Sequence, residues 1–418
     1  MTSKHTKGIC IIGGGLAGLS MAALLEQEGL PVTCIDSEPL ARQMSLEFDG
    51  RTTAVSYGSR AVLERAGVWE GLTRQSAAIE TIDILDGDSS DVMTFRAADV
   101  DADAFGWIVD NADLRRALIK RVQTLKNVRH ITGVSVDDVE LGDECARITL
   151  TDGQVIEAAI AIGADGRKSL LREKMGIGHW GRDYKQTAIV CLVAHEKPHN
   201  GLAVEHFRRE GPFALLPFTD LPDGTHRSAL VWTVHGPNAK RWVNAPEDVF
   251  NTALQERAGN RFGKIWAASR REAWPLNLVK SYTYTGTRAV LVAEAAHGMH
   301  PIAGQGLNMS LRDLDVLADL LIEAHTEGRD FGDETILKTY QRRRRLDNIL
   351  MCAATDNLTI LFSNDFLPLK LLRRTGLSIV KRIPAAMKFF MHQAMGVNAA
   401  QRAGKILQAV SLEKRSGR

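Results

Sequence analysis

The 418-residue sequence has few cysteines, and no two of them stand at the spacing of a metal site. Its five cysteines are scattered and odd in number: Cys10, Cys34, Cys145, Cys191 and Cys352. This pattern argues against a disulfide framework or a zinc knuckle and favours a reducing compartment. Cys10 and Cys34 stand in apolar runs, so we expect both to be buried thiols.

The sequence also lacks a strong net charge. Lys and Arg number 52 against 50 Asp and Glu, a net charge of +2, which argues against a nucleic-acid partner. The uncharged segment 8–25 could be taken for a signal peptide or a short membrane span. Gly13, Gly14, Gly15 and Gly18 within it argue against this, because each glycine costs about 1 kcal/mol in a helix interior. We therefore expect a cytoplasmic protein without a membrane span. At roughly 100–200 residues per domain, the length predicts two or three domains.

The segment 8–36 predicts a strand, a glycine-rich turn, a helix and a second strand. The turn, Gly13-Gly14-Gly15-Leu16-Ala17-Gly18, has the form G-x-G-x-x-G. In this form the first glycine permits the tight turn, the second lets a pyrophosphate approach, and the third lets helix and strand pack closely. Asp36, which ends the second strand, would bind a ribose diol and repel a 2′-phosphate. The segment therefore favours FAD or NAD over NADP.

Two later segments also run from an apolar strand into a polar turn. Residues 158–162 lead into a turn that contains Asp165, and residues 289–293 lead into 294–308. Leucines at spacings of three and four then predict a helix after Gly306, namely Leu307, Leu311, Leu314, Leu317 and Leu321. The start of this helix, at Gly304-Gln305-Gly306, would suit an anion such as the pyrimidine edge of a reduced flavin.

The order of these three segments resembles the order of the conserved motifs in the class A flavoprotein aromatic hydroxylases. Within that class, the chain resembles the ubiquinone-biosynthesis hydroxylases over segments that cover nearly its whole length: 49–56, 109–115, 211–217, 300–308, 340–345, 355–358 and 394–396. One departure concerns the third motif, which usually begins Gly-Asp-Ala-Ala-His in the family. Here Ala293-Glu294 replaces Gly-Asp, and the longer Glu294 would need a small shift to keep the family's bond to a ribityl hydroxyl.

The resemblance implies an α/β fold of the para-hydroxybenzoate hydroxylase type. We expect a Rossmann-like FAD-binding domain formed by residues 1–75, 100–180 and 283–345. An inserted antiparallel β-sheet substrate domain would comprise 76–99 and 181–282, and a C-terminal helical region would follow from 346 to 418. Four runs in the insertion predict consecutive strands: 188–195, 203–208, 213–219 and 228–234.

The resemblance also implies the reaction. NADH or NADPH would reduce FAD, O2 would add at the flavin C4a atom, and the resulting hydroperoxide would hydroxylate a polyprenylated phenol in ubiquinone biosynthesis. Two alternatives stay open: hydroxylation of a small soluble aromatic compound, and a non-catalytic FAD-binding accessory protein.

The candidate site residues follow from the motifs and the resemblance. The ADP half of FAD would lie against Gly13, Gly15, Leu16, Ala17, Gly18 and Asp36. Further contacts to FAD or the reductant would come from Arg51, Arg115 and Asp165, and the ribityl chain and ring would be surrounded by Glu294, Gly304, Gln305, Gly306, Leu307 and Asn308. Pro301 would face the substrate, and His300 could assist deprotonation of the phenol. Phe218 and Trp232 could line the phenol site, although a core role suits Trp232 better.

The tail after Asp347 predicts helices that combine apolar and basic residues. Two interpretations stay open: a peripheral contact with the inner face of the membrane, or packing against the FAD-binding domain with a solvated basic face. We expect the charge run Arg342–Arg345 to be solvated. Other ubiquinone-biosynthesis proteins are further candidate partners.

Overall fold

The computed structural model describes residues 7–45, 50–87, 89, 91–299 and 304–362, together with 383, 387–388, 391–392 and 395–396. The two predicted catalytic residues, His300 and Pro301, lie outside the described residues. So do Asp49 and most of the predicted C-terminal helical region.

A six-stranded sheet forms one half of the molecule, in the order β19-β20-β12-β1-β2-β8. Its strands are β1 (Ile9–Ile12), β2 (Val32–Asp36), β8 (Val128–Thr132), β12 (Ile160–Gly163), β19 (Thr285–Gly286) and β20 (Ala289–Leu291). All neighbours are parallel except β19 and β20. Residues 9–12 are all buried because the sheet is covered on both faces, as the unbroken apolar runs predict.

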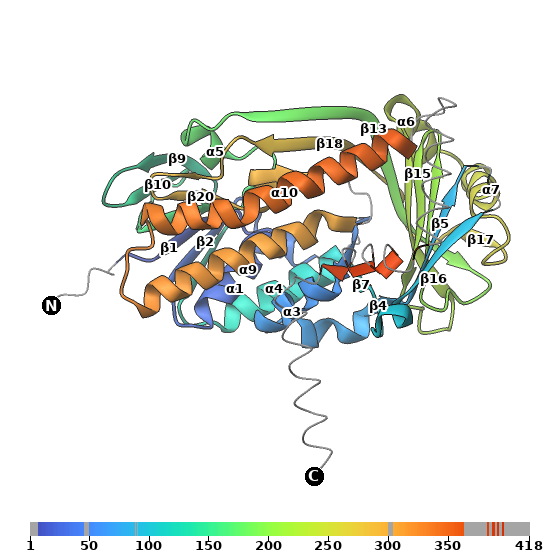
Figure 1. Ribbon diagram of the computed structural model, residues 1–418, viewed down its shortest axis with the longest axis horizontal. Helices are drawn as coiled ribbons and strands as arrows, with labels where there is room; N and C mark the ends of the chain where they lie inside the picture. Colours follow the sequence, from blue (N-terminus) through green and yellow to red (C-terminus); the bar gives the residue numbers. More distant parts are fainter. Residues whose placement is uncertain are drawn as a thin grey trace, which may run out of the picture.

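Long helices cover one face of this sheet (Figure 1). Helix α1 (Leu16–Glu26) packs against both α4 (Asn111–Thr124) and α9 (Gln305–Thr326), and α9 packs against α10 (Glu334–Phe362). The predicted leucine stripe of α9 is confirmed, because Leu311, Leu314, Leu317 and Leu321 are buried in the main core. Cys10 and Cys34 are buried free thiols, also as predicted.

A nine-stranded sheet forms the other half. Eight strands follow the order β21-β18-β13-β16-β15-β14-β5-β6, and β17 pairs with β13. These strands are β5 (Thr81–Asp86), β6 (Val92–Arg96), β13 (His179–His195), β14 (Leu202–Arg208), β15 (Gly211–Phe218), β16 (His226–His235), β17 (Ile265–Ala267), β18 (Glu272–Ser281) and β21 (His297–Gly298). The sheet is antiparallel as predicted, except that β5 runs parallel to β14. The exception arises because β5 belongs to an earlier segment of the chain, so no tight hairpin fixes its direction relative to β14.

The two faces of this sheet differ. The outer face packs on α6 (Gly236–Val243) and α7 (Glu247–Ala258) in a core that contains Trp232. The inner face packs toward a small sheet of β3 (Thr52–Ser56), β4 (Ser76–Ile79) and β7 (Gly106–Asp110). Trp232 is thus a core residue, whereas Phe218 lies in the inner cluster.

Short elements complete the chain. A three-stranded sheet comprises β9 (Val136–Leu141), β10 (Ala146–Leu150) and β11 (Val155–Ala158). The short helices are α2 (Leu40–Gln43), α3 (Tyr57–Arg65), η1 (Trp69–Gln75), η2 (Ala97–Val100), α5 (Leu170–Lys174) and α8 (Ala293–Ala296). The predicted fold class, a parallel Rossmann-like sheet with a second large sheet built from inserted strands, is confirmed.

Candidate functional site

The first glycine-rich turn joins β1 to α1. Gly13 has φ +105°, and a Cβ there would lie 2.4 Å from the carbonyl oxygen of Ala164. A Cβ on Gly18 would lie 1.8 Å from the carbonyl oxygen of Gly13. At Gly15, by contrast, a Cβ would meet no atom of the described chain within 4 Å. Gly13 and Gly18 are therefore required by the protein itself, while Gly15 leaves open space at the start of α1.

The start of α1 has the character of an anion site. Gly15 is its N-cap and offers no side chain to the first N–H groups, and the first turn, which begins with Leu16 and Ala17, carries no acidic residue. The free N–H groups and the positive end of the helix dipole favour a phosphate there.

Asp36 lies directly beside this turn. A Cβ on Gly14 would lie 2.8 Å from the Cβ of Asp36. The Asp36 carboxylate accepts a hydrogen bond of 2.8 Å from the backbone N–H of Glu38, and Arg115 Nη1 lies 3.8 Å from Glu38 Oε2. The fold thus brings Arg115 of α4 to the same strand end as Asp36.

Asp165 follows β12 and lies next to Gly13. Its Oδ2 accepts a hydrogen bond of 3.2 Å from the backbone N–H of Leu171. Its buried Oδ1 has no hydrogen-bond partner within the described residues, and burial raises the pKa of this carboxyl. A buried polar atom without a partner marks a place where a ligand donor would fit.

Arg51 lies elsewhere, under the nine-stranded sheet. Its guanidinium stacks over the Trp274 ring of β18, 4.3 Å from the ring centroid. Its backbone oxygen accepts a hydrogen bond of 3.2 Å from Asn111, the first residue of α4. The loop before β3 is thereby held between the two halves of the molecule.

The third predicted segment follows β20. Ala293 has φ +54°, a left-handed conformation that costs an L-residue about 1–2 kcal/mol. This geometry explains why glycine is usual at the position in the resembling family. The half-exposed Glu294 binds Arg167, with Oε1 3.0 Å from Nε and 2.8 Å from Nη2. Arg167 belongs to the Asp165 turn, so Glu294 ties the second segment to the third.

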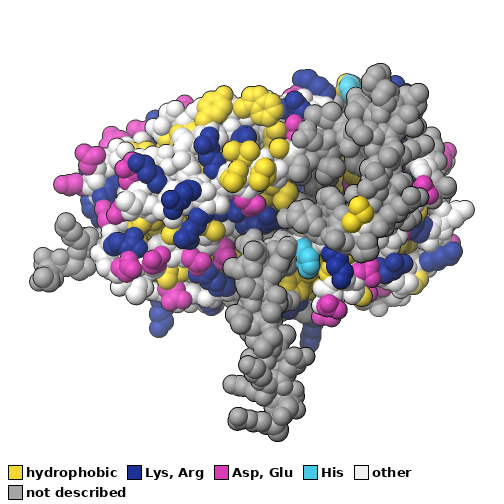
Figure 2. Space-filling model, in the orientation of Figure 1, with side chains coloured by type: hydrophobic (Ala, Val, Ile, Leu, Met, Phe, Trp, Pro, Cys, Tyr) yellow, Lys and Arg dark blue, Asp and Glu magenta, His cyan; other side chains and the backbone are white. Residues whose placement is uncertain are grey.

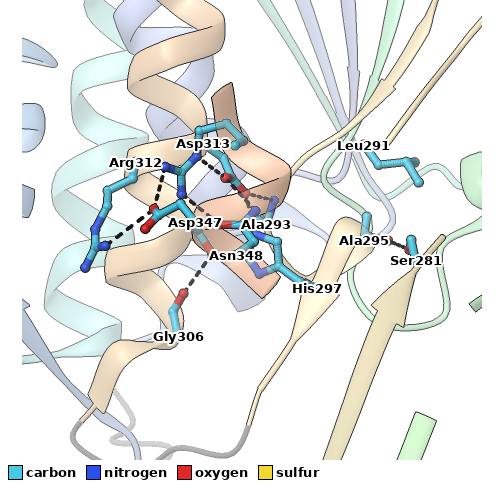
Figure 3. Close-up of polar contacts among 12 residues, drawn as sticks. Ser281, Leu291, Ala293, Ala295, His297, Gly306, Arg312, Asp313, Asp347 and Asn348 are labelled. Atoms are coloured by element: carbon cyan, nitrogen blue, oxygen red, sulfur yellow. Dashed lines mark hydrogen bonds and ion pairs between the residues drawn. The ribbon is translucent and has the colours of Figure 1, made fainter. Parts of the chain in front are cut away.

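A buried ionic network holds this segment against α9 and α10 (Figure 3). Asp313 of α9 is fully buried, and its Oδ2 lies 2.5 Å from His297 Nε2. The same oxygen accepts a hydrogen bond of 3.3 Å from the backbone N–H of Ala293. One carboxylate therefore contacts both ends of helix α8.

Arg344 of α10 completes the network. Its Nε donates to Asp313 Oδ1 at 2.7 Å, and its other nitrogens reach Asp347 and Asn348, each at 2.7 Å. Burial alone would raise the pKa of Asp313, but the charges of His297 and Arg344 and their hydrogen bonds hold it well below its ordinary value. Asp313 is therefore a buried anion whose charge is balanced by residues from two other segments.

The start of α9 is fixed by contacts with β3. Gly304, the N-cap, has φ +62°, and a Cβ there would lie 2.9 Å from the Ala54 Cβ. Asn308 Oδ1 accepts a hydrogen bond of 2.9 Å from the backbone N–H of Ser56, and its Nδ2 donates to the Ala54 oxygen at 2.8 Å. Asn308 therefore positions the helix through β3.

The rest of the first turn of α9 is arranged like that of α1. A Cβ on Gly306 would meet no described atom within 4 Å. The buried Gln305 Oε1 lies 3.5 Å from Arg312 Nη2, and Leu307 packs against the main core. The first turn of α9 contains no acidic residue. Both helix starts are therefore open toward a ligand and suited to negative charge.

Asp313 and Arg344 were not among the site residues predicted from the sequence, and the prediction that Arg344 belongs to a solvated charge run is wrong. Arg344 is buried because it shares the inner face of α10 with Leu337, Tyr340 and Asn348, at helical spacings of three and four. That spacing was the signal in the sequence from which the burial of Arg344 could have been predicted. The exposed Arg342, Arg343 and Arg345 match the prediction.

Comparison with known proteins gives the family context. Residues 6–351 match the family model described as FAD binding domain. A ubiquinone hydroxylase, UbiL, of Rhodospirillum rubrum is 38% identical over 388 residues, which span 93% of this chain and 89% of that protein. The 3-demethoxyubiquinol 3-hydroxylase of Escherichia coli is 29% identical and is matched over its full length, with 95% of this chain covered.

A solved structure supports the fold. The p-nitrophenol 4-monooxygenase PnpA of Pseudomonas putida superposes with a TM-score of 0.75, covering 93% of this chain and 98% of that one at 17% identity. At this identity the match shows a shared fold.

Proposed function

We propose a substrate and a reaction for this chain, which belongs to the FAD binding domain family and, within it, to the flavoprotein monooxygenases of ubiquinone biosynthesis. The enzyme hydroxylates a polyprenylated phenol, with NADH or NADPH as reductant and O2 as co-substrate. The observation that carries the proposal is the pair of open helix starts, at Gly15 and Gly306, in a chain of this family.

The residues of the site fit one FAD molecule. Gly13, Gly15 and Gly18 would hold the pyrophosphate at the start of α1, and Asp36 would bind the ribose of the ADP half. The unpartnered Oδ1 of Asp165 would accept a hydrogen bond from the cofactor. The N–H groups at the start of α9 would stabilise negative charge on the ring. When bound, FAD would carry electrons from the nicotinamide to O2, and O2 would supply the oxygen atom that enters the substrate.

Glu294 needs a role of its own, because its carboxylate already binds Arg167. We propose that it orders the Asp165 turn through this pair and meets the ribityl chain with its second oxygen. The half-exposed position leaves that oxygen accessible. Arg115, which lies near Glu38 at the strand end that carries Asp36, would contact the ADP half or a transiently docked reductant.

We propose the same domain limits as before: 1–75, 100–180 and 283–345 for the FAD-binding domain, and 76–99 and 181–282 for the substrate domain. Residues of the substrate domain would cover the ring and exclude water, which is needed because water diverts activated oxygen into hydrogen peroxide. His300 and Pro301 would lie on the substrate side of the flavin.

Peripheral membrane contact would give the enzyme access to a lipid-soluble substrate. In the described part of the chain, no helix is long and apolar enough to cross a bilayer. Large hydrophobic side chains gather along α10 and the adjoining ends of β13 and β18, with Lys and Arg between them (Figure 2). The exposed residues of this surface are Trp180, Tyr282, Leu346 and Leu350, flanked by Arg342 and Arg345 on α10. Apolar, aromatic and cationic side chains together favour an anionic bilayer surface.

Two measurements test the proposal. Purified, FAD-loaded protein should consume NADH or NADPH and add one oxygen atom to a phenol that carries two isoprene units. A strain without the gene should accumulate the corresponding unhydroxylated quinone precursor. A normal quinone pool in that strain would contradict the assignment to ubiquinone biosynthesis, and conversion of small soluble phenols alone would favour the alternative substrate class.

A further inference from the structure

Glu205 is an acidic residue in the middle of an apolar surface. It lies on β14, where backbone pairing sets it opposite Ala214 of β15 and beside Ile84 of β5. Paired residues on neighbouring strands point to the same face of a sheet. Glu205 therefore shares its face with Ala203 on its own strand, which belongs to the inner cluster.

This inner face covers the segment that leads into β3. A Cβ on Gly50 would lie 2.9 Å from Val190 of β13, and Arg51 stacks on Trp274 of β18. Most of the inner cluster is apolar: Ile79, Met93, Phe95, Phe105, Ile108, Leu192, Phe218, Met391 and Met395. The face that carries Glu205 thus looks toward the part of the fold proposed to hold the flavin ring.

The carboxylate of Glu205 has no hydrogen bond or ion pair within the described residues. Its side chain is half-buried, so a small molecule can still reach it. Burial alone raises the pKa of Glu205 to about 7, since no charged neighbour contributes to the shift. An unpaired, desolvated carboxyl costs stability and supports no other part of the fold, which is typical of functional groups.

Other charged groups share this face of the sheet. On the strands these are Asp86 of β5, Arg227 of β16 and Glu272 of β18. On the described C-terminal residues, Met387 packs on the same cluster beside the exposed Lys388, and a half-buried His392 follows. None of these groups contributes to the pKa shift of Glu205, whose cause is burial.

We propose that Glu205 accepts the hydrogen bond of the substrate's phenolic hydroxyl and takes its proton as the ring is hydroxylated. This inference rests on the function proposed above. Loss of the O–H proton leaves its electron pair on the oxygen, which makes the ring a stronger nucleophile toward the incoming oxygen atom. A new C–O bond then forms as the O–O bond of the O2-derived oxidant breaks, and the second oxygen atom leaves as water with electrons that come from the nicotinamide. The proton of the substituted ring carbon passes to solvent, which restores the aromatic ring. A base with a pKa near the working pH suits this task.

The test compares Glu205→Gln with wild type and with Glu210→Gln. Glu210 is an exposed acid at the end of the same hairpin and serves as the control. FAD-loaded proteins are assayed with NADH, NADPH and the phenol that carries two isoprene units, from pH 5.5 to 9. Oxygenated product and hydrogen peroxide are both measured.

In wild type and in Glu210→Gln, we expect the maximal hydroxylation rate to rise as the pH increases through about 7. In Glu205→Gln this rise should disappear, with product formation about 10²-fold lower at high pH and more peroxide per nicotinamide oxidised. Glu205→Asp should recover part of the pH dependence. An unchanged pH profile in Glu205→Gln would overturn the inference. Absence of product from wild type with every phenol would instead contradict the proposed function.

Discussion

The two open helix starts of this protein are built in different ways. The start of α1 is fixed largely within one βαβ unit, where Gly18 approaches Gly13 and Gly14 lies against Asp36, and Gly13 also contacts Ala164 after β12. The start of α9 is fixed from a distance. Asn308 holds it to β3, about 250 residues earlier in the chain, and Asp313 joins it to Arg344 on α10.

A short sequence motif can therefore encode the conformation at the start of α1, whereas the conformation at the start of α9 depends on tertiary contacts. A motif can specify the first start, because steric limits on glycine act between neighbours. The start of α9 needs buried polar residues whose partners lie far away in sequence. Substitutions at the two places should therefore fail in different ways.

The largest effect is expected for Asp313→Asn. The substitution removes the anion that balances Arg344 and His297, and loss of one member of a buried pair typically costs about 3–5 kcal/mol. The free energy of unfolding, measured in urea at pH 7, should fall by about this amount. A fall in the free energy of unfolding of less than about 1 kcal/mol would show that the Asp313 network does not hold the start of α9.

The same variant should lose part of the acid sensitivity of the wild type. The pKa of Asp313 is depressed in the folded protein, so its stabilisation is complete above the unfolded pKa of about 3.9 and is lost as the pH falls further. The difference in unfolding free energy between wild type and Asp313→Asn should therefore shrink below about pH 4. A difference that stays constant down to the lowest pH at which both proteins fold would contradict this sign.

A smaller loss of stability is expected for a substitution at the start of α1. Gly18→Ala would place a methyl group 1.8 Å from the Gly13 oxygen, and overpacking of this kind costs about 1–3 kcal/mol. Gly71→Ala, in η1, is the matched control because a Cβ there meets no described atom within 4 Å. The melting temperature of Gly18→Ala should be lower than that of Gly71→Ala. Equal melting temperatures would contradict the close approach of Gly18 to the Gly13 oxygen.

The smallest expected effect is a gain in folding stability. Ala293→Gly relieves the left-handed backbone before Glu294, so we expect about 1 kcal/mol of added stability. Ala295→Gly, two residues later in the same short helix, should instead destabilise. A loss of stability in Ala293→Gly would show that the conformation carries no strain.

The sequence predicted the parts of the site that depend on local spacing. The Gly13–Gly18 turn, the strand that ends at Asp36 and the helix after Gly304 could be identified from motif and periodicity. Asp313 and Arg344 were not identified, because helical spacing can place Arg344 on the inner face of its helix but does not show which partner would balance either charge. Their burial depends on α9 and α10 packing together, which only the fold provides.

Glu205 shows the same limit. Its strand was predicted, but its face could be assigned only after the pairing of β14 with β15 and β5 was known. A shift of the register by one residue would move it to the outer face.

The most direct test of the account is the affinity of the apoprotein for FAD in Gly15→Ala and Gly306→Ala, measured by quenching of flavin fluorescence. A Cβ at either position meets no described atom within 4 Å, so both variants should fold as the wild type does. If one FAD spans both helix starts, each variant should still bind one equivalent, with affinity at least about tenfold weaker, a loss of about 1.4 kcal/mol. Undiminished affinity in either variant would contradict the account, because the cofactor would then not contact that helix start.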